Sequence, residues 1–323
     1  MLENHFSSNE VLSDRVNTFG QDLLRRYGER VHKLAVNAGF TCPNRDGSKG
    51  RGGCTFCNNV SFSPNARSEP DVLGQLASGR EVLAKRTGAK KFLAYFQAYT
   101  NTYADVADLD KMYRQALSQP DVIGLSVGTR PDCVPPPVLD LLASYQDEGY
   151  EIWLELGLQS AFDHTLEKVN RGHDFQEYQQ AIAASHERQL QVCTHLIVGL
   201  PGEAAADSLL SLERVLDLGV EGLKIHPLHV VKGTLLANQW RRQEYQPLAF
   251  QDYVDTVVQI IAHTPHDVVF HRLTGTAPDA ILLAPQWCNW KWRVLNAITH
   301  GLVASDLRQG SLHRPLPTAI NSD

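Results

Sequence analysis

Three cysteines in one glycine-rich loop are the strongest chemical signal in the chain. Cys42 is followed by Cys54 after eleven residues and by Cys57 after two more. Two thiolates separated by two residues can bind one metal ion or adjacent corners of a cluster, and a third thiolate is brought in by the loop. Soft thiolate ligands select zinc, Cu(I) or iron–sulfur clusters. The spacing therefore indicates a metal site. The alternative is that the three cysteines lie close together in the sequence by chance.

Zinc and a four-iron cluster both fit the cysteine triplet taken alone. A structural zinc site has four protein ligands, and the best fourth ligand here is His32, since Asn44 and Asp46 are weak donors. Three thiolates on a [4Fe–4S] cluster would instead leave one iron free for chemistry, unlike an electron-transfer cluster with four cysteines. The other three cysteines are too scattered to predict a second cluster, and we expect them to be small buried residues. They are Cys133, Cys193 and Cys288.

Composition predicts an ordinary folded protein. The chain has 323 residues, 43% of them apolar, and a formal net charge of −6. That is enough to bury the core of one barrel-sized domain or two smaller ones. Mild acidity argues against broad, non-specific binding of nucleic acids but allows local basic patches. The basic groups are Arg25, Arg26, Arg30 and Lys33, then Lys85, Arg86, Lys90 and Lys91, and later Arg241 with Arg242. Taken alone, each group is more simply explained as part of a solvent-exposed surface.

The beginning of the chain has acidic residues and no apolar core of a signal peptide. No apolar run approaches the roughly 18 residues that mark a membrane span. We therefore expect a cytoplasmic protein that does not enter the membrane, with its thiols kept reduced.

Strand-like apolar segments alternate with helical patterns along most of the chain. The predicted strands are Val31–Asn37, Lys91–Phe96, Asp121–Val127, Glu151–Leu158, Gln191–Leu200 and Gly222–Leu228, and DVVFHRL (Asp267–Leu273) adds a short strand later in the chain. Alternation of this kind predicts an α/β fold with a parallel sheet and helices outside it, either doubly wound or a partial, TIM-like (βα)6 barrel. We predict a lead-in over residues 1–30, a core barrel over 31–235 and a C-terminal extension over 236–323 packed on the barrel.

Polar residues follow the ends of these strands. In parallel barrels the active site lies at the carboxyl ends of the strands, so these residues should share one edge. They are Cys42, Gln97, Asp132, Gln159, Gly199 and His226. Glu155 is notable in addition, because a carboxylate within a parallel strand is costly to bury without a partner.

Together with the cysteine loop, five segments carry a resemblance to a known family. They are YFQAYTNTY (Tyr95–Tyr103), VGTRPDCV (Val127–Val134), ELGLQS with NRGHD (Glu155–Ser160 and Asn170–Asp174), HLIVGLPGE (His195–Glu203), and KIHPLHVVKGT with HRLTG (Lys224–Thr234 and His271–Gly275). From about Val31 to Lys291 the sequence resembles the radical S-adenosylmethionine (SAM) superfamily. It is most similar to a bacterial family of this chain length, related to the radical SAM subunit of Elongator and to the oxygen-independent coproporphyrinogen dehydrogenases.

The resemblance implies a cofactor arrangement. Cys42, Cys54 and Cys57 would hold a [4Fe–4S] cluster whose free iron binds SAM. The residues implied in SAM binding are Gln97, Thr100 and Asn101, where relatives commonly have Gly-Gly-Glu, and then Glu155, Gln159, Ser160, Arg171, Ile197 and Gly199. The candidates for substrate contact are Arg130, Asp132, Lys224, His226 and Arg272. Each also has a structural alternative, such as a helix cap for Asp132 or a satisfied core histidine for His226.

The implied reaction is reductive cleavage of SAM to a 5′-deoxyadenosyl radical that abstracts hydrogen from a substrate. An external one-electron donor, resembling flavodoxin or ferredoxin, would reduce the cluster. Similarity to Elongator suggests a wobble uridine of tRNA, whereas similarity to the coproporphyrinogen enzymes suggests a small molecule. Trp287, Trp290 and Trp292 could stack on a base or ring, or could be packing residues. A zinc-stabilised binding protein without redox chemistry and a simple iron–sulfur carrier are the alternatives from other classes.

Overall fold

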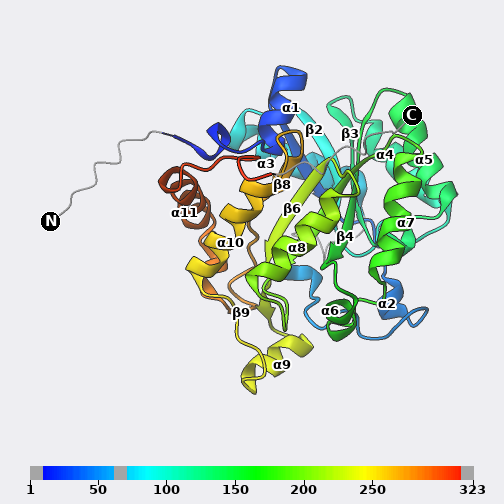
Figure 1. Ribbon diagram of the computed structural model, residues 1–323. Helices are drawn as coiled ribbons and strands as arrows, with labels where there is room; N and C mark the ends of the chain where they lie inside the picture. Colours follow the sequence, from blue (N-terminus) through cyan, green and yellow to red (C-terminus); the bar gives the residue numbers. More distant parts are fainter. Residues whose placement is uncertain (1–9, 62–70, 314–323) are drawn as a thin grey trace, which may run out of the picture.

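A seven-stranded parallel sheet forms the centre of the computed structural model, which describes residues 10–61 and 71–313 (Figure 1). The strand order is β1-β2-β3-β4-β5-β6-β8, and every pair is parallel. The strands are β1 (Val31–Val36), β2 (Lys91–Phe96), β3 (Val122–Thr129), β4 (Glu151–Gln159), β5 (Gln191–Val198), β6 (Gly222–Pro227) and β8 (Val269–Arg272). The sheet curls into a half-barrel whose two edges are β1 and β8.

Long helices cover the outer face of the half-barrel (Figure 1). They are α3 (Val72–Thr87), α4 (Val106–Leu117), α5 (Pro136–Asp147), α7 (Phe175–His186), α8 (Ala205–Leu216), α10 (Phe250–His263) and α11 (Lys291–Ala304). Two of them begin at a capping aspartate: Asp71 accepts from the amide of Gly74, and Asp174 accepts from that of Glu177. The apolar residues of the helices pack on the sheet in one core cluster.

Short elements gather at the ends of the half-barrel. Near the carboxyl ends of the strands lie α2 (Pro43–Asp46), α6 (Asp163–Lys168) and α9 (Leu235–Arg241), below the arrowhead of β4 in Figure 1. A small antiparallel pair joins β7 (Val230–Val231) and β9 (Leu282–Ala284). The 3₁₀ turns are η1 (Leu12–Asp14), η2 (Asn59–Ser61), η3 (Pro131–Cys133) and η4 (Gln286–Asn289). At the opposite end, α1 (Phe19–Tyr27) packs against β8.

The predicted partial barrel of alternating strands and helices is confirmed, with one addition. The segment Val269–Arg272, predicted as a short strand of the C-terminal extension, pairs with β6 and is the seventh strand of the main sheet. The lead-in supports it, since Thr18 bridges to Phe270 and the Gln309 side chain accepts from the amide of Asn17. Residues 1–9 of the predicted lead-in lie outside the described part. None of the described helices has the length and apolar character needed to cross a membrane.

Replacing Leu23 by alanine tests the contribution of α1. The side chain is 1% exposed and packs with Phe19, Val31 and Trp153. Because the substitution leaves a cavity, we expect the free energy of unfolding to fall by about 2–5 kcal/mol in urea denaturation. Leu235→Ala, at a position 52% exposed, is the control and should change stability by less than about 0.5 kcal/mol. Equal effects of the two substitutions would show that α1 is not part of the folded core.

Candidate active site

The carboxylate of Glu155 lies at the centre of the half-barrel and is bound by side chains from all the other strands of the main sheet. Its side chain has no exposure to solvent. Lys33 comes from β1, Tyr95 from β2, Ser126 from β3, His195 from β5, Lys224 from β6 and His271 from β8. Each strand thus contributes one polar residue to a single interior layer.

Two lysines neutralise this buried charge, and two histidines add polar contacts to it. Lys33 donates to Oε1 of Glu155, whereas Lys224 and His195 lie 2.9 and 2.7 Å from Oε2. The remaining contacts are Ser126 Oγ at 2.5 Å, Tyr95 Oη at 3.0 Å and His271 Nδ1 at 3.5 Å. A buried carboxylate needs such partners because its desolvation is otherwise very costly.

The same layer determines the charge state of its members. Burial alone would raise the pKa of Glu155, but Lys224 and Lys33, helped by the histidines, hold it well below its usual range. Burial lowers the pKa of His195 to about 4 and that of His271 to about 3, so both imidazoles are neutral at pH 7. Burial also lowers the pKa of Lys224 to about 8, against the pull of Glu155.

The cysteine loop is fastened to the carboxyl ends of the strands by backbone hydrogen bonds. Within the loop, the amide of Gly53 donates to the carbonyl of Asn44 at 2.8 Å. The amide of Thr55 donates to the carbonyl of Val169 at 2.9 Å, and the Asn170 side chain donates to the carbonyl of Gly53. A long loop without regular structure is thereby held against the segment that follows β4, as expected of a functional loop.

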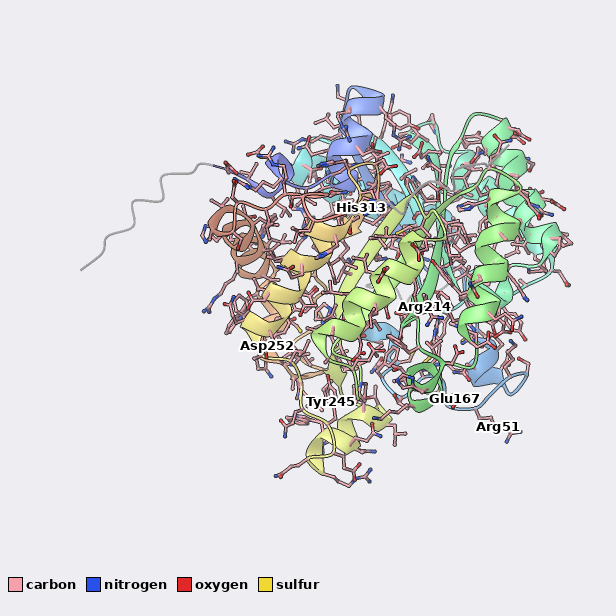
Figure 2. All side chains as sticks on the ribbon, viewed as in Figure 1. Arg51, Glu167, Arg214, Tyr245, Asp252 and His313 are labelled. Carbon is pink, nitrogen blue, oxygen red and sulfur yellow. The ribbon has the colours of Figure 1, made fainter. Side chains whose placement is uncertain are left out.

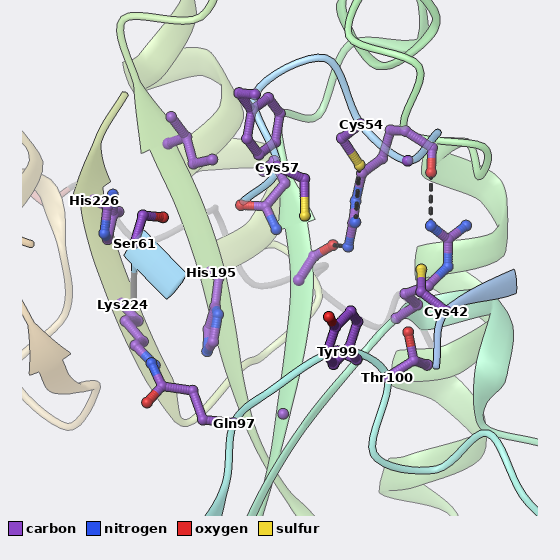
Figure 3. Close-up of a pocket in the computed structure, with 18 of the residues that line it drawn as sticks. Cys42, Cys54, Cys57, Ser61, Gln97, Tyr99, Thr100, His195, Lys224 and His226 are labelled. Carbon is purple, nitrogen blue, oxygen red and sulfur yellow. Dashed lines mark hydrogen bonds between the residues drawn. The ribbon is translucent and has the colours of Figure 1, made fainter. Parts of the chain in front are cut away.

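The three predicted cysteines face one cavity as free thiols (Figure 3). Arg171 Nη1 lies 3.5 Å from Sγ of Cys54, and Arg45 donates to the carbonyl of Cys57 at 2.7 Å. Burial raises the pKa of the Cys57 thiol, and Arg45 partly offsets that rise. Among the described residues, no three His, Cys, Asp or Glu side chains surround a single metal-ion position. His32, the proposed fourth zinc ligand, does not line this cavity.

The cavity has two chemically different sides. Figure 3 shows the cysteines on one side, with Tyr99 and Thr100 below them, and His195, Lys224, His226 and Gln97 on the other. Two buried nitrogen atoms of lining residues, Arg171 Nε and His229 Nδ1, have no partner among the described atoms. Soft thiolates that share a cavity with unpaired polar groups fit an iron–sulfur cluster with a polar ligand beside it.

Most of the predicted site residues reach this cavity. Those that line it are the three cysteines, Gln97, Thr100, Gln159, Arg171, Ile197, Arg130, Lys224, His226 and Arg272. Residues around its end of the barrel include Arg51, Glu167 and Tyr245, labelled at the lower edge of Figure 2. Tyr245 closes one side of this end by donating to the carbonyl of Gly199 at 2.8 Å.

Five predicted site residues do not line the cavity: Asn101, Asp132, Glu155, Ser160 and Gly199. The Asn101 amide ties β2 to β3 by donating to the carbonyls of Phe96 and Gly128. The Ser160 hydroxyl donates to Glu203. Gly199 has φ of +92° and packs so closely on Leu248 that a Cβ would lie 2.9 Å from its Cδ1. Each of the three therefore has a structural role in this conformation.

Asp132 and Glu155 are likewise occupied by protein partners. Arg130 forms a two-pronged ion pair with Asp132 at 2.8 Å, and Lys49 adds a third contact at 2.7 Å. These cations hold the pKa of Asp132 well below its usual range although burial opposes them. Arg130 also donates to the carbonyl of Arg171, so this pair fixes the end of β3 against the loop that carries Arg171.

Sequence reasoning did not identify the layer around Glu155. The sequence places Lys33 only in a group of basic surface residues and Tyr95 and His195 only in motifs. Ser126 is only part of a predicted strand. The available signal was a polar residue inside an apolar strand, as in Leu125-Ser126-Val127. That signal does not say which strands meet, because partners such as Lys33 and Glu155 lie 122 residues apart.

Comparison with known proteins identifies the class. The family model described as the radical SAM superfamily matches residues 40–213, and the model of the radical SAM C-terminal domain matches residues 220–303. The chain therefore belongs to the radical SAM superfamily, whose members are enzymes that bind a [4Fe–4S] cluster and SAM and take electrons from an external donor. This confirms the predicted family, enzyme class and cofactors.

Individual relatives place the chain within that class. It is 50% identical to Protein YhcC of Escherichia coli strain K12, covering 94% of this chain and 97% of that protein. It is 27% identical to the tRNA uridine(34) acetyltransferase of Dehalococcoides mccartyi, covering 50% of this chain and 35% of the other. The solved archaeal Elp3 of Methanocaldococcus infernus shares the fold, with a TM-score of 0.62 at 17% identity over 86% of this chain and 64% of that one.

The neutral state of His271 predicts acid sensitivity. The folded pKa of about 3 lies below the usual 6.5, so the unfolded state binds more protons as the pH falls through 6.5. Stability from this group is present above pH 6.5 and is lost below it, by roughly 1.4 kcal/mol per pH unit. In urea titrations between pH 6 and pH 4.5, His271→Asn should flatten the dependence of stability on pH by that amount. His300→Asn, at an exposed position of α11, is the control; equal slopes for the two variants would contradict the argument.

Proposed function

We propose that this chain is a radical SAM enzyme that modifies RNA, with a wobble uridine of tRNA as its substrate, and that Cys42, Cys54 and Cys57 hold its cluster. The observation that carries the cluster assignment is the convergence of the three thiols on one cavity. When bound, the cluster and SAM supply a 5′-deoxyadenosyl radical for hydrogen abstraction. A flavodoxin- or ferredoxin-like protein is the proposed electron donor, and a reducing cytoplasm suits the thiols.

The SAM assignment rests on polar groups that share the cavity with the thiols. Gln97, Thr100, Gln159 and Arg171 line the cavity near the ends of neighbouring strands, and Ile197 adds an apolar surface. The unpartnered Nε of Arg171 is a donor suited to a carboxylate. Gln159 keeps a left-handed backbone with φ of +83°, a conformation that costs energy in a non-glycine residue and is often retained at functional sites.

The opposite side of the cavity is the proposed place of substrate. Lys224 and His226 lie there, away from the cysteines, and Arg272 lines the same cavity. The rings of His226 and His229 contact each other at a tilt of 59°, with centroids 4.5 Å apart, and burial holds the pKa of both below 6.5. Neutral imidazoles and two basic side chains suit a substrate that carries hydrogen-bonding groups and negative charge. The name of the Dehalococcoides relative, which refers to uridine 34 of tRNA, supports RNA.

Substitution of the cysteines tests the cluster assignment. Cys42→Ala, Cys54→Ala and Cys57→Ala should each leave the protein with little iron and acid-labile sulfide after anaerobic reconstitution, because each removes a thiolate ligand. Cys288→Ala is the matched control, since Cys288 is buried in the core away from the cavity, and it should load like the unaltered protein. A variant lacking one of the three cysteines that loads normally would remove that residue from the ligand set.

The substrate is tested with RNA directly. Unmodified bacterial tRNA is incubated anaerobically with the reconstituted enzyme, SAM and a reductant, and its nucleosides are analysed by mass spectrometry. We expect a mass change confined to the wobble uridine, together with faster formation of 5′-deoxyadenosine when tRNA is present. Cleavage of SAM that is indifferent to tRNA, with all nucleosides unchanged, would refute the RNA substrate and direct attention to a small molecule.

A further inference from the structure

A cleft opens along the side of the half-barrel, where its edges β1 and β8 face each other. One wall consists of β1 and the end of α3, the other of β8 and the start of α11, and α1 closes one end. The side cleft joins the active-site cavity, because Ser61, Tyr95, Gln97, Lys224 and Arg272 line both. It is therefore a lateral route to the place proposed for the substrate.

The charged side chains in the described lining of the side cleft are all basic. Arg30, Lys33, Arg86, Lys224, Arg272 and Lys291 line it, and none of its described lining residues is an aspartate or glutamate. This is notable in a chain with a net charge of −6. A cleft lined by charges of one sign concentrates ligands of the opposite sign.

The cations at the rim are not neutralised by neighbouring carboxylates. Among the described residues no ion pair involves Arg30, Arg86 or Lys291. Several basic residues elsewhere are paired: Arg26 with Glu151, Lys85 with Glu81, Lys91 with Glu29 and Arg242 with Glu244. The rim cations also repel one another electrostatically. Burial lowers the pKa of Lys291, and the positive charges of Arg272 and Arg86 lower it further.

Exposed aromatic rings stand beside this rim. Trp290 and Trp292 are 46% and 72% exposed, whereas Trp287 is buried against Tyr253. Lys291, which lies between the two exposed rings in sequence, has its Nζ 5.2 Å from the centroid of Trp292. Exposed aromatic rings interleaved with cations are the usual platform for unpaired bases.

We propose that the side cleft is the RNA-binding surface of this enzyme: Arg30, Arg86 and Lys291 contact backbone phosphates at the rim, Trp292 stacks on an unpaired base, and the target nucleotide enters the cavity between β1 and β8. The inference rests on the proposed RNA substrate and deepens it. An enzyme that reacts with a base must take it out of the stack, and unpaired bases of a loop are the ones free to stack on aromatic rings.

Binding of a fluorescently labelled anticodon stem–loop RNA with a wobble uridine tests the side cleft. The variant Arg86→Glu/Lys291→Glu is compared with Lys85→Glu/Lys111→Glu, which changes the net charge equally at exposed residues outside the cleft. Lys85 directly precedes Arg86 on α3. We expect the cleft variant to lose about tenfold or more in affinity at physiological salt, and its slope of log K against log salt to be shallower by roughly 1.5–2. The control should stay within about twofold.

Two further variants complete the test. Trp292→Ala should weaken binding by about 5–100-fold, the range for loss of one stacked base. Arg86→Gln/Lys291→Gln removes the charges without reversing them and should show most of the loss; equal melting temperatures establish that each variant folds. Cleft variants that bind RNA as tightly as the control would overturn the side-cleft proposal while leaving the RNA substrate intact. An unaltered protein that binds no RNA even at low salt would overturn both.

Discussion

Glu155 places a negative charge at the centre of the half-barrel, where its side chain has no contact with solvent. A charge in that position is tolerated only if nearby groups replace the lost water. Polar side chains take the place of that water. Each of the other strands of the main sheet supplies one of them to the same interior layer. The register of the strands and the position of Lys224 at the cavity both depend on this one requirement.

The layer also sets the electrostatics of the cavity above it. Two lysines face one carboxylate, and Arg272 adds a further cation where the cavity meets the side cleft. The thiols lie across the cavity, on a loop fastened by backbone hydrogen bonds and by the packing of Phe56. The result places the soft, metal-binding thiols on one side of the cavity, with Arg45 and Arg171 beside them, and Lys224 with His226 on the other. That separation is the physical basis for assigning cofactors to one and an anionic substrate to the other.

The sequence predicts the parts of this arrangement that depend on local pattern. Apolar strands alternating with helices predict a parallel half-barrel, and residues such as Gln97 and Gln159 at strand ends are correctly expected at one edge. The pairing of strands through Glu155 depends on register across long separations, which no local pattern contains. Glu155 was recognised as unusual because it is a carboxylate within a strand, but its carboxylate binds protein side chains below the cavity. The sequence also did not predict that β8 joins the main sheet, because a four-residue strand carries little signal.

The most direct test of the two-sided cavity is electron paramagnetic resonance of the anaerobically reconstituted, dithionite-reduced protein, recorded with and without SAM. If the cluster lies at Cys42, Cys54 and Cys57 with its free iron facing the polar side, SAM will shift the signal of the reduced cluster. A [4Fe–4S] signal that is the same with and without saturating SAM would contradict that placement, because it would mean that the iron facing the cavity is not open to SAM.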